Sequence, residues 1–411
     1  MRSLGRTFRL FNFRLRVVAL FAILAATGAE GGPQAGTAGK PSGVSTSSDG
    51  FAKVVARATA AREQDRIAEA LSLYEQALKI RPRWEEGIWY LGTMLYDQDR
   101  YDEARDWFRR LVALKPKNAP AWALLGLCEF QTREYPKALA DLKRARFLGI
   151  RPDDQLASVA RFHTAILLTR FEEYEMAYDV LREFARDQNE NSSVIEAMGI
   201  NTLRMPYLPV EVPPDKREQV LLAGRAAFDM AARRVQNARS SFQELVSRYP
   251  QAPNVHYAHG VFLLTENSDA ALEEFKRELG LNPSHVPAML QIAFELLKRG
   301  SNKDALSFAE DAVRLAPNLF PARNALGRAL LETGDVAGAV KQLEAGVDLA
   351  PDSPEMRFVL ARAYARAGRK DDAARERAEF VRLDRINRTQ RLGAHSVGGT
   401  EIPSGEKPPG L

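Results

Sequence analysis

Apolar side chains recur through most of the chain at the spacing of one face of an α-helix, and short polar turns separate the apolar stripes. In residues 85–118 the two stripes are Ile88, Leu91, Gly92 and Leu95, then Ala104, Phe108 and Leu111. Small residues at Gly92 and Ala104 allow the two helix backbones to approach closely. Pro116 ends the second helix because proline lacks the N–H that a continuing helix requires. The pattern therefore predicts pairs of short amphipathic helices that pack as hairpins.

These positions return with a period of 34 residues. The small residue of the first helix recurs at Gly92 and Gly126, then at Ala293, Gly327 and Ala361. The small residue of the second helix and the closing proline follow the same step, at Ala70, Ala104, Ala138, Ala305, Ala339 and Ala373 and at Pro82, Pro116, Pro283, Pro317 and Pro351. Each hairpin has an apolar face that it cannot cover alone, so we expect successive hairpins to stack into an all-α solenoid.

The repeats resemble tetratricopeptide repeats (TPR). The residues that carry the resemblance include Trp122, Leu125, Gly126, Ala138, Leu142 and Ala145 in one repeat and Met289, Ile292, Ala293, Leu296, Ala305, Ala309, Ala312 and Pro317 in another. The resemblance covers most of residues 51–387. It implies a TPR α-solenoid, a right-handed superhelix of about eight or nine helix-turn-helix repeats whose concave wall binds partners. It says little about which partner is bound, because one framework serves many functions.

The middle of the chain departs from the period. Residues 51–191 contain four repeats, and residues 253–387 contain further repeats that end in a C-terminal cap. Between them, residues 192–252 begin like a first helix, but no second helix follows at the expected place. Four prolines between 205 and 214 instead predict an extended loop. We therefore expect residues 192–252 to be an irregular helical region with a degenerate repeat.

The two ends of the chain have the composition of segments outside a folded array. Residues 1–29 are Arg-rich, then apolar from Val17 to Ala26, then small near Ala29, which is typical of a secretory signal peptide. We expect cleavage near Ala29 and export to the periplasm or envelope of a bacterial cell, with an uncleaved membrane anchor as the alternative. The Gly-, Pro- and Ser-rich residues 30–50 predict a flexible linker, and residues 388–411 predict a disordered tail.

Charge and cysteine content exclude several classes of function. The formal net charge is +5, from 58 Lys and Arg and 53 Asp and Glu. Five of the arginines lie in residues 1–29, which contain no acidic residue, so the remainder has a net charge of zero and gives no reason to expect nucleic-acid binding. Cys128 is the only cysteine, which excludes an intramolecular disulfide and a multi-cysteine metal site.

The sequence carries no catalytic or cofactor motif. His256 and His259 lie three residues apart, as two metal ligands on a helix can, but no third ligand is near, and packing histidines are the favoured interpretation. The HExxH, CxxC, phosphate-loop and GxSxG patterns are absent from the region that the repeats span. We therefore expect a non-catalytic protein without a cofactor. Two alternatives remain, an envelope enzyme or enzyme subunit with a pocket at residues 192–250 and a membrane-anchored assembly factor.

The resemblance also implies candidate binding residues. In tetratricopeptide repeats the second, fifth, ninth, twelfth and thirteenth places face the groove. The aromatic and basic residues at those places are Trp89, Tyr96, Phe130, Phe162, Arg170, Tyr257, Phe294, Lys298, Arg328, Phe358, Arg362 and Arg366. Aromatic rings offer rigid contact area and arginine binds carboxylates with two parallel hydrogen bonds, so the set suits a protein partner or an extended peptide. For any single aromatic residue, packing between adjacent repeats is an equally weighted alternative.

Overall fold

The computed structural model describes residues 45–151 and 155–396. Within these residues the regular elements are α-helices and two short 3-10 helices, with no strand, which confirms the all-α fold class. The predicted signal peptide at 1–29, residues 30–44 of the predicted linker and residues 397–411 of the predicted tail lie outside the described residues. The chain divides into two compact units between Leu167 and Leu168.

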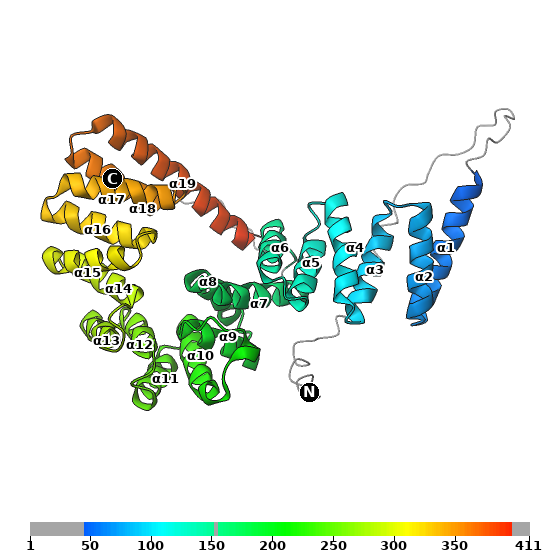
Figure 1. Cartoon of the computed structure of the whole chain (residues 1–411), viewed down its shortest axis with the longest axis horizontal. Helices are drawn as coiled ribbons and strands as arrows, with labels where there is room; N and C mark the ends of the chain where they lie inside the picture. Colours follow the sequence, from blue (N-terminus) through cyan, green and yellow to red (C-terminus); the bar gives the residue numbers. More distant parts are fainter. Residues whose placement is uncertain (1–44, 152–154, 397–411) are drawn as a thin grey trace, which may run out of the picture. The chain divides into compact units, whose positions relative to one another are not determined.

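The N-terminal unit is a series of helix hairpins (Figure 1). Its helices are α1 (Ser45–Glu63), α2 (Ile67–Ile80), α3 (Glu85–Asp97), α4 (Tyr101–Leu114), α5 (Ala119–Gln131), α6 (Tyr135–Leu148) and most of α7 (Gln155–Arg170). Within the hairpins α1 packs on α2, α3 on α4 and α5 on α6, while α2 touches α3 and α4 touches α5. This is the nearest-neighbour stacking that the period predicted.

The C-terminal unit continues the same scheme after an irregular start. Its elements are α8 (Tyr174–Arg186), α9 (Ser192–Thr202), the 3-10 helices η3 (Pro209–Glu211) and η4 (Pro214–Lys216), α10 (Arg217–Ala231), α11 (Val235–Arg248), α12 (Val255–Leu263), α13 (Ser268–Leu281), α14 (Val286–Lys298), α15 (Asn302–Leu315), α16 (Phe320–Thr333), α17 (Val336–Leu349), α18 (Pro354–Arg366) and α19 (Lys370–Ser396). From α10 onward consecutive helices pair, α10 with α11 through α18 with α19. The first helices also touch one another, α14 with α16 and α16 with α18, so they form one wall.

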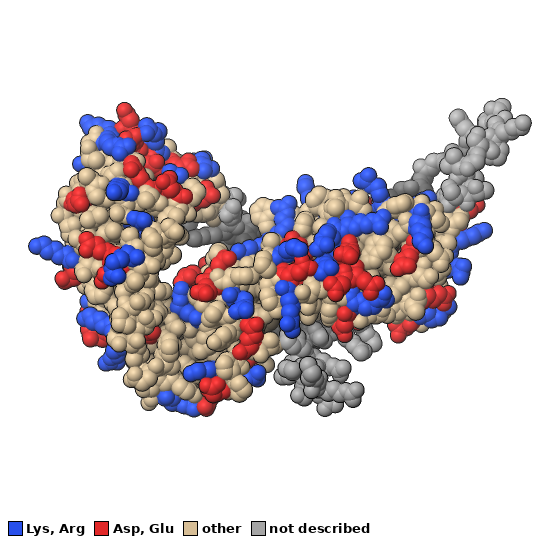
Figure 2. All heavy atoms as spheres, viewed as in Figure 1, with Lys and Arg blue, Asp and Glu red and all other residues tan. Residues whose placement is uncertain are grey.

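The surface carries charges of both signs. In the view of Figure 2, Lys and Arg side chains are interspersed with Asp and Glu side chains. Many of them form ion pairs one helical turn apart, for example Arg100 with Glu103 at 2.6 Å and Lys276 with Glu273 at 2.8 Å. Such exposed pairs contribute little stability, and they keep the outer faces of the helices solvated.

Small residues lie where the two helices of a hairpin meet. A Cβ atom at Gly92 would lie 2.8 Å from the ring of Phe108, and a Cβ atom at Gly126 would lie 2.8 Å from the side chain of Leu142. Real Cβ atoms do not approach other atoms so closely, so a larger residue would push the helices apart. The close approach that the sequence predicted at Gly92 is therefore present in the structure.

Helices α9 and α10 are in backbone contact at two glycines. A Cβ atom at Gly199 would overlap the carbonyl oxygen of Val220, and a Cβ atom at Gly224 would overlap the carbonyl oxygen of Ile195. Helix α10 also packs on α11, so it serves both as the partner of α9 and as the first helix of the next hairpin. The sequence predicted that no second helix follows α9 at the 34-residue spacing. In the structure the partner of α9 is α10, which comes after the proline-rich loop.

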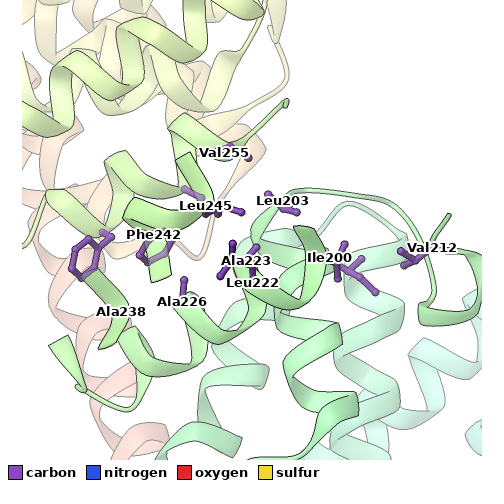
Figure 3. Close-up of a cluster of buried hydrophobic side chains, with 13 residues drawn as sticks. Ile200, Leu203, Val212, Leu222, Ala223, Ala226, Ala238, Phe242, Leu245 and Val255 are labelled. Carbon is purple, nitrogen blue, oxygen red and sulfur yellow. The ribbon is translucent and has the colours of Figure 1, made fainter. Parts of the chain in front are cut away.

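The proline-rich loop is anchored to the helices. Leu208 and Val212 are buried, and Val212 belongs to an apolar cluster that joins the loop to α9, α10, α11 and α12 (Figure 3). The sequence predicted an extended loop, and this prediction is wrong in part, because the short helices η3 and η4 interrupt the loop. Pro209 and Pro214 begin these two turns, since the proline ring fixes φ near the helical value.

Both terminal helices reach into segments that composition marked as flexible. Helix α1 begins at Ser45, so residues 45–50 of the predicted linker are helical. Helix α19 continues to Ser396, past the predicted start of the tail at residue 388. Adding a residue to a helix that is already formed gains a hydrogen bond without a new nucleation step, and no proline interrupts either extension. Local composition therefore placed both boundaries too close to the repeats.

Gly199→Ala should destabilise the C-terminal unit, because the added methyl group has to displace the backbone of α10 at Val220. Overpacking of this kind costs roughly 1 to 3 kcal/mol. We expect the thermal unfolding midpoint of the full chain, followed by circular dichroism, to fall by several degrees. Gly280→Ala on α13 is the control, since nothing lies within 4 Å of a Cβ atom there. Equal midpoints for the two variants would contradict the backbone contact.

Candidate functional site

The wall formed by α14, α16 and α18 carries six of the predicted binding residues. They are Phe294 and Lys298 on α14, Arg328 on α16, and Phe358, Arg362 and Arg366 on α18. We call this set the aromatic-basic wall. All six side chains are exposed or half-buried, so a ligand can reach them. The structure thus brings together those predicted residues that belong to three consecutive first helices.

Arg328 is the centre of a small polar group on α16. Its guanidinium lies 5.7 Å from the ring centre of Phe294 and 3.9 Å from the carboxylate of Glu355. Asn324, which sequence reasoning missed, is buried one turn before Arg328 and donates a hydrogen bond of 3.0 Å to Glu355. Asn324 occupies the fifth place of its repeat but is neither aromatic nor basic. Its amide holds Glu355 beside Arg328, so it positions the charged pair.

The two arginines at the end of α18 share one carboxylate on α16. Arg362 donates to Glu332 at 2.9 Å, and Arg366 lies 3.3 Å from the same carboxylate. Arg366 also donates to the backbone carbonyl of Leu331 at 2.6 Å. Two guanidinium groups therefore face one exposed carboxylate, which leaves a local excess of positive charge.

Beside these arginines the wall has a shallow apolar depression. The ring of Phe358, which is 46% exposed, lies 5.4 Å from the ring of Phe380 on α19. The depression measures about 270 Å³ and is lined by Phe358, Ala361, Arg362, Arg377, Phe380 and Val381. An apolar side chain of a ligand can pack there while a neighbouring carboxylate reaches Arg362 or Arg377.

Three predicted binding residues are buried. Phe130 packs edge-on against the ring of His163 at 4.7 Å, and Phe162 also contacts that ring. Tyr257 packs on the ring of His285 at 5.0 Å. Burial lowers the pKa of His163 to about 4, so its ring is neutral and packs as a flat, mostly apolar group. For Phe130, Phe162 and Tyr257 the expectation of ligand contact is corrected to packing within the array, because their side chains are buried.

In the N-terminal unit, Trp89 and Tyr96 are half-buried on α3. Trp89 packs edge-on against Phe108 at 6.0 Å, and Tyr96 packs against Tyr101 at 5.3 Å. Burial raises the pKa of the Tyr96 hydroxyl, so it stays protonated at neutral pH. Both rings therefore support the α3–α4 hairpin and keep only part of their surface for a ligand.

Arg170 holds the proline-rich loop instead of facing an open groove. Its guanidinium donates to the carbonyl of Pro206 at 2.6 Å and lies 3.7 Å from Glu211. Arg204, at the equivalent thirteenth place of the next repeat, was not among the predicted residues. It pairs with Glu175 at 2.7 Å and lies over the ring of Tyr174 at 4.4 Å. Its arginine at the thirteenth place could have identified Arg204 from the sequence. It was missed because the repeat that begins with α9 departs from the regular pattern.

His256 and His259 belong to a buried polar cluster with Glu274. Nδ1 of His256 lies 2.5 Å from the Glu274 carboxylate, and Nε2 lies 2.9 Å from the Pro250 carbonyl oxygen. His259 lies 3.6 Å from the same carboxylate. Among the described residues no group of three or more His, Cys, Asp or Glu side chains could hold a metal ion.

The Glu274 cluster should make the stability of the C-terminal unit depend on pH. Burial alone would raise the pKa of the Glu274 carboxyl, but the two imidazoles lower it to about 2 from an ordinary 4.5. A carboxyl with a lowered pKa stabilises the fold above its ordinary value, and this stabilisation is lost as the pH falls from 4.5 towards 2. The unfolding midpoint of Glu274→Gln should therefore lie well below that of the original protein at pH 5 and close to it at pH 2.

Glu273→Gln is the matched control for this measurement. Glu273 is the preceding residue on α13, is exposed and pairs with Lys276. We expect its midpoint to follow that of the original protein at both pH values. A difference between Glu274→Gln and the original protein that stays constant from pH 5 to pH 2 would overturn the assigned role of the cluster.

Comparison with known proteins gives the family of the repeats. A tetratricopeptide repeat model matches residues 55–119, 110–155, 221–286 and 324–379, which together make up more than half of the chain. The match at 221–286 includes most of α10 and all of α11 to α13, so it extends into the region that the sequence marked as degenerate. Among the described residues, none of the helices is both long enough and apolar enough to cross a bilayer.

Two proteins of similar sequence share only part of their length with this chain. It is 25% identical over 128 residues to the general transcriptional corepressor trfA of Dictyostelium discoideum and 24% identical over 240 residues to the protein O-mannosyl-transferase TMTC3 of Homo sapiens. These matches cover 31% and 54% of this chain but only 9% and 25% of those proteins. A solved structure of MamA 41-end from Desulfovibrio magneticus RS-1 matches with 23% identity and a TM-score of 0.36, over 42% of this chain and 97% of that chain. A MamA RS-1 ArsTM double mutant matches with 22% identity and a TM-score of 0.38, over 41% of this chain and 96% of that chain.

Proposed function

Because the chain belongs to the tetratricopeptide repeat family, we propose that it is a non-catalytic scaffold that binds a protein or an extended peptide on the aromatic-basic wall. One observation carries the proposal. Phe294, Arg328, Phe358 and Arg362 remain reachable on three adjacent first helices, whereas the other aromatic residues at groove places are buried or packed within their hairpin. The mannosyl-transferase name of one relative does not transfer, since this chain spans only 25% of that protein.

The chemistry of the wall indicates what the partner presents. Arg362 and Arg366 share Glu332, and Arg328 reaches Glu355 only at 3.9 Å. Exposed ion pairs of this kind are worth less than about 1 kcal/mol, so a carboxylate of the partner can compete with them. The depression at Phe358 takes an apolar side chain. A peptide that combines an apolar residue with nearby Asp or Glu residues satisfies both features.

Photo-crosslinking tests the wall directly. We expect a photoreactive phenylalanine in place of Phe358 to crosslink the partner in extracts of the source cell, and Arg362→Ala to reduce the yield at least fivefold because it removes one charge beside the depression. The same probe in place of Phe147 on α6 is the control. Phe147 is 77% exposed, so it is at least as accessible as Phe358 but lies outside the wall. Equal crosslinking from both positions, or a yield that Arg362→Ala leaves unchanged, would refute binding at the wall.

We also propose that the chain is exported, because residues 1–29 have the order of a secretory signal peptide. Mass spectrometry of the mature N-terminus should find a chain that begins near Glu30 in the envelope fraction. Leu20→Arg interrupts the apolar run and should retain the full-length chain in the cytosol. A membrane-bound product that begins at Met1 would instead indicate an uncleaved anchor, and a cytosolic product of the unaltered gene would exclude export.

A further inference from the structure

A pocket of about 710 Å³ lies between the C-terminal ends of α8 and α10. Both helices belong to the C-terminal unit and pack against α9 (Figure 1). Its lining residues come from the two helix ends and the turns that follow them, namely Tyr178, Arg182, Ala185, Arg186, Gln188, Met230, Ala231, Ala232, Arg233 and Arg234. None of these residues belongs to the aromatic-basic wall.

The lining contains four arginines and no acidic residue. Two of the arginines are already paired with carboxylates around the pocket. Arg182 pairs with Asp179 at 2.8 Å, and Arg234 pairs with Glu190 at 2.7 Å and with Asp229 at 3.3 Å. These pairs hold Arg182 and Arg234 in place and neutralise most of their charge.

Arg186 and Arg233 are different. In the described part of the chain, no carboxylate lies within ion-pair distance of either guanidinium. Both side chains are exposed at the pocket. The Nε atom of Arg182 is buried there and also has no hydrogen-bond acceptor in the described residues. A basic residue near the C-terminal end of a helix gains a modest stabilisation from the helix dipole. The dipole supplies no specific hydrogen-bond acceptor for the guanidinium N–H groups.

Apart from Gln188, the remainder of the lining is apolar or aromatic. Ala185, Ala231, Ala232 and Met230 form an apolar surface, and the half-buried ring of Tyr178 lies next to it. The volume falls within the range of roughly 300 to 1,000 Å³ that is usual for ligand sites. The pocket thus combines an apolar surface with two guanidinium groups that lack a carboxylate partner among the described residues. A guanidinium group can donate two parallel hydrogen bonds to the two oxygens of one carboxylate.

We propose that this pocket binds an acidic segment of a partner protein, with one carboxylate on Arg186 and a neighbouring carboxylate on Arg233. The charge balance favours this ligand over a polyphosphate. Two unpaired guanidinium groups match one or two negative charges, whereas a polyphosphate would place a larger negative charge beside Asp179, Asp229 and Glu190. The apolar surface packs against the aliphatic part of the acidic side chains. This inference does not depend on binding at the aromatic-basic wall.

Fluorescence anisotropy of the full chain with a labelled peptide of alternating glutamate and alanine tests the proposal. We expect saturable binding that Arg186→Ala combined with Arg233→Ala weakens at least tenfold. Replacing both arginines by lysine keeps the charges but removes the two-pronged donors, so it should weaken binding by a smaller factor. Arg225→Ala is the matched control, because Arg225 is exposed on α10 but does not line the pocket. The affinity of the Arg225→Ala variant for the peptide should equal that of the original protein.

Three results would overturn the proposal. The first is the absence of saturable peptide binding by the unaltered chain. The second is an equal loss of affinity in the Arg225→Ala control and in the double alanine variant, which would indicate diffuse charge attraction. The third is displacement of the peptide by inorganic pyrophosphate at lower concentrations than by unlabelled peptide, which would assign the site to phosphate ligands. Unchanged circular dichroism spectra and unfolding midpoints would establish that the double variants are folded.

Discussion

The close approach of paired helices at small residues is the constraint on which the rest of the structure depends. A helix hairpin buries its apolar stripe only when the two backbones come near enough for the side chains to interlock. Gly92 against Phe108 and Gly126 against Leu142 show how the missing side chain of one helix leaves room for a large side chain of the other. The large residue then fills the space between the helices. The same contact recurs at Gly260 against Phe275 and at Gly327 against Leu343, so the array repeats one way of packing.

The irregular middle obeys the same constraint in another way. Helix α9 has no second helix within its own repeat, and an exposed apolar stripe would be costly. Two glycines, Gly199 and Gly224, bring the backbones of α9 and α10 into contact, and the apolar cluster around Phe242 covers the remaining surface (Figure 3). The proline-rich loop bridges the extra distance and contributes Val212 to that cluster. The repeat is thus interrupted in sequence while burial of the apolar stripe continues.

This interruption has consequences for the surface. Helix α10 packs on α9 and on α11, which brings the end of α10 close to the end of α8 and creates the arginine-lined pocket between them. In the regular part, α14, α16 and α18 lie side by side and leave the aromatic-basic wall uncovered. The two surfaces carry arginine in different settings. On the wall Arg328, Arg362 and Arg366 have carboxylates within 4 Å, whereas Arg186 and Arg233 in the pocket have none among the described residues.

The sequence by itself determined the helices, their pairing and the family, because a 34-residue recurrence of small residues and prolines reflects contacts that are local along the chain. It also located the candidate face, through the places of Phe294, Arg328, Phe358 and Arg362 within their repeats. Only the tertiary structure decided which candidates are reachable. Phe130 and Phe162 occupy the same kinds of place as Phe358, but both are buried. It likewise decided that α10 completes α9 and that Arg186 and Arg233 share a pocket although 47 residues separate them. Burial and charge pairing depend on residues that are distant in sequence but close in the fold. A periodic sequence pattern does not identify those neighbours.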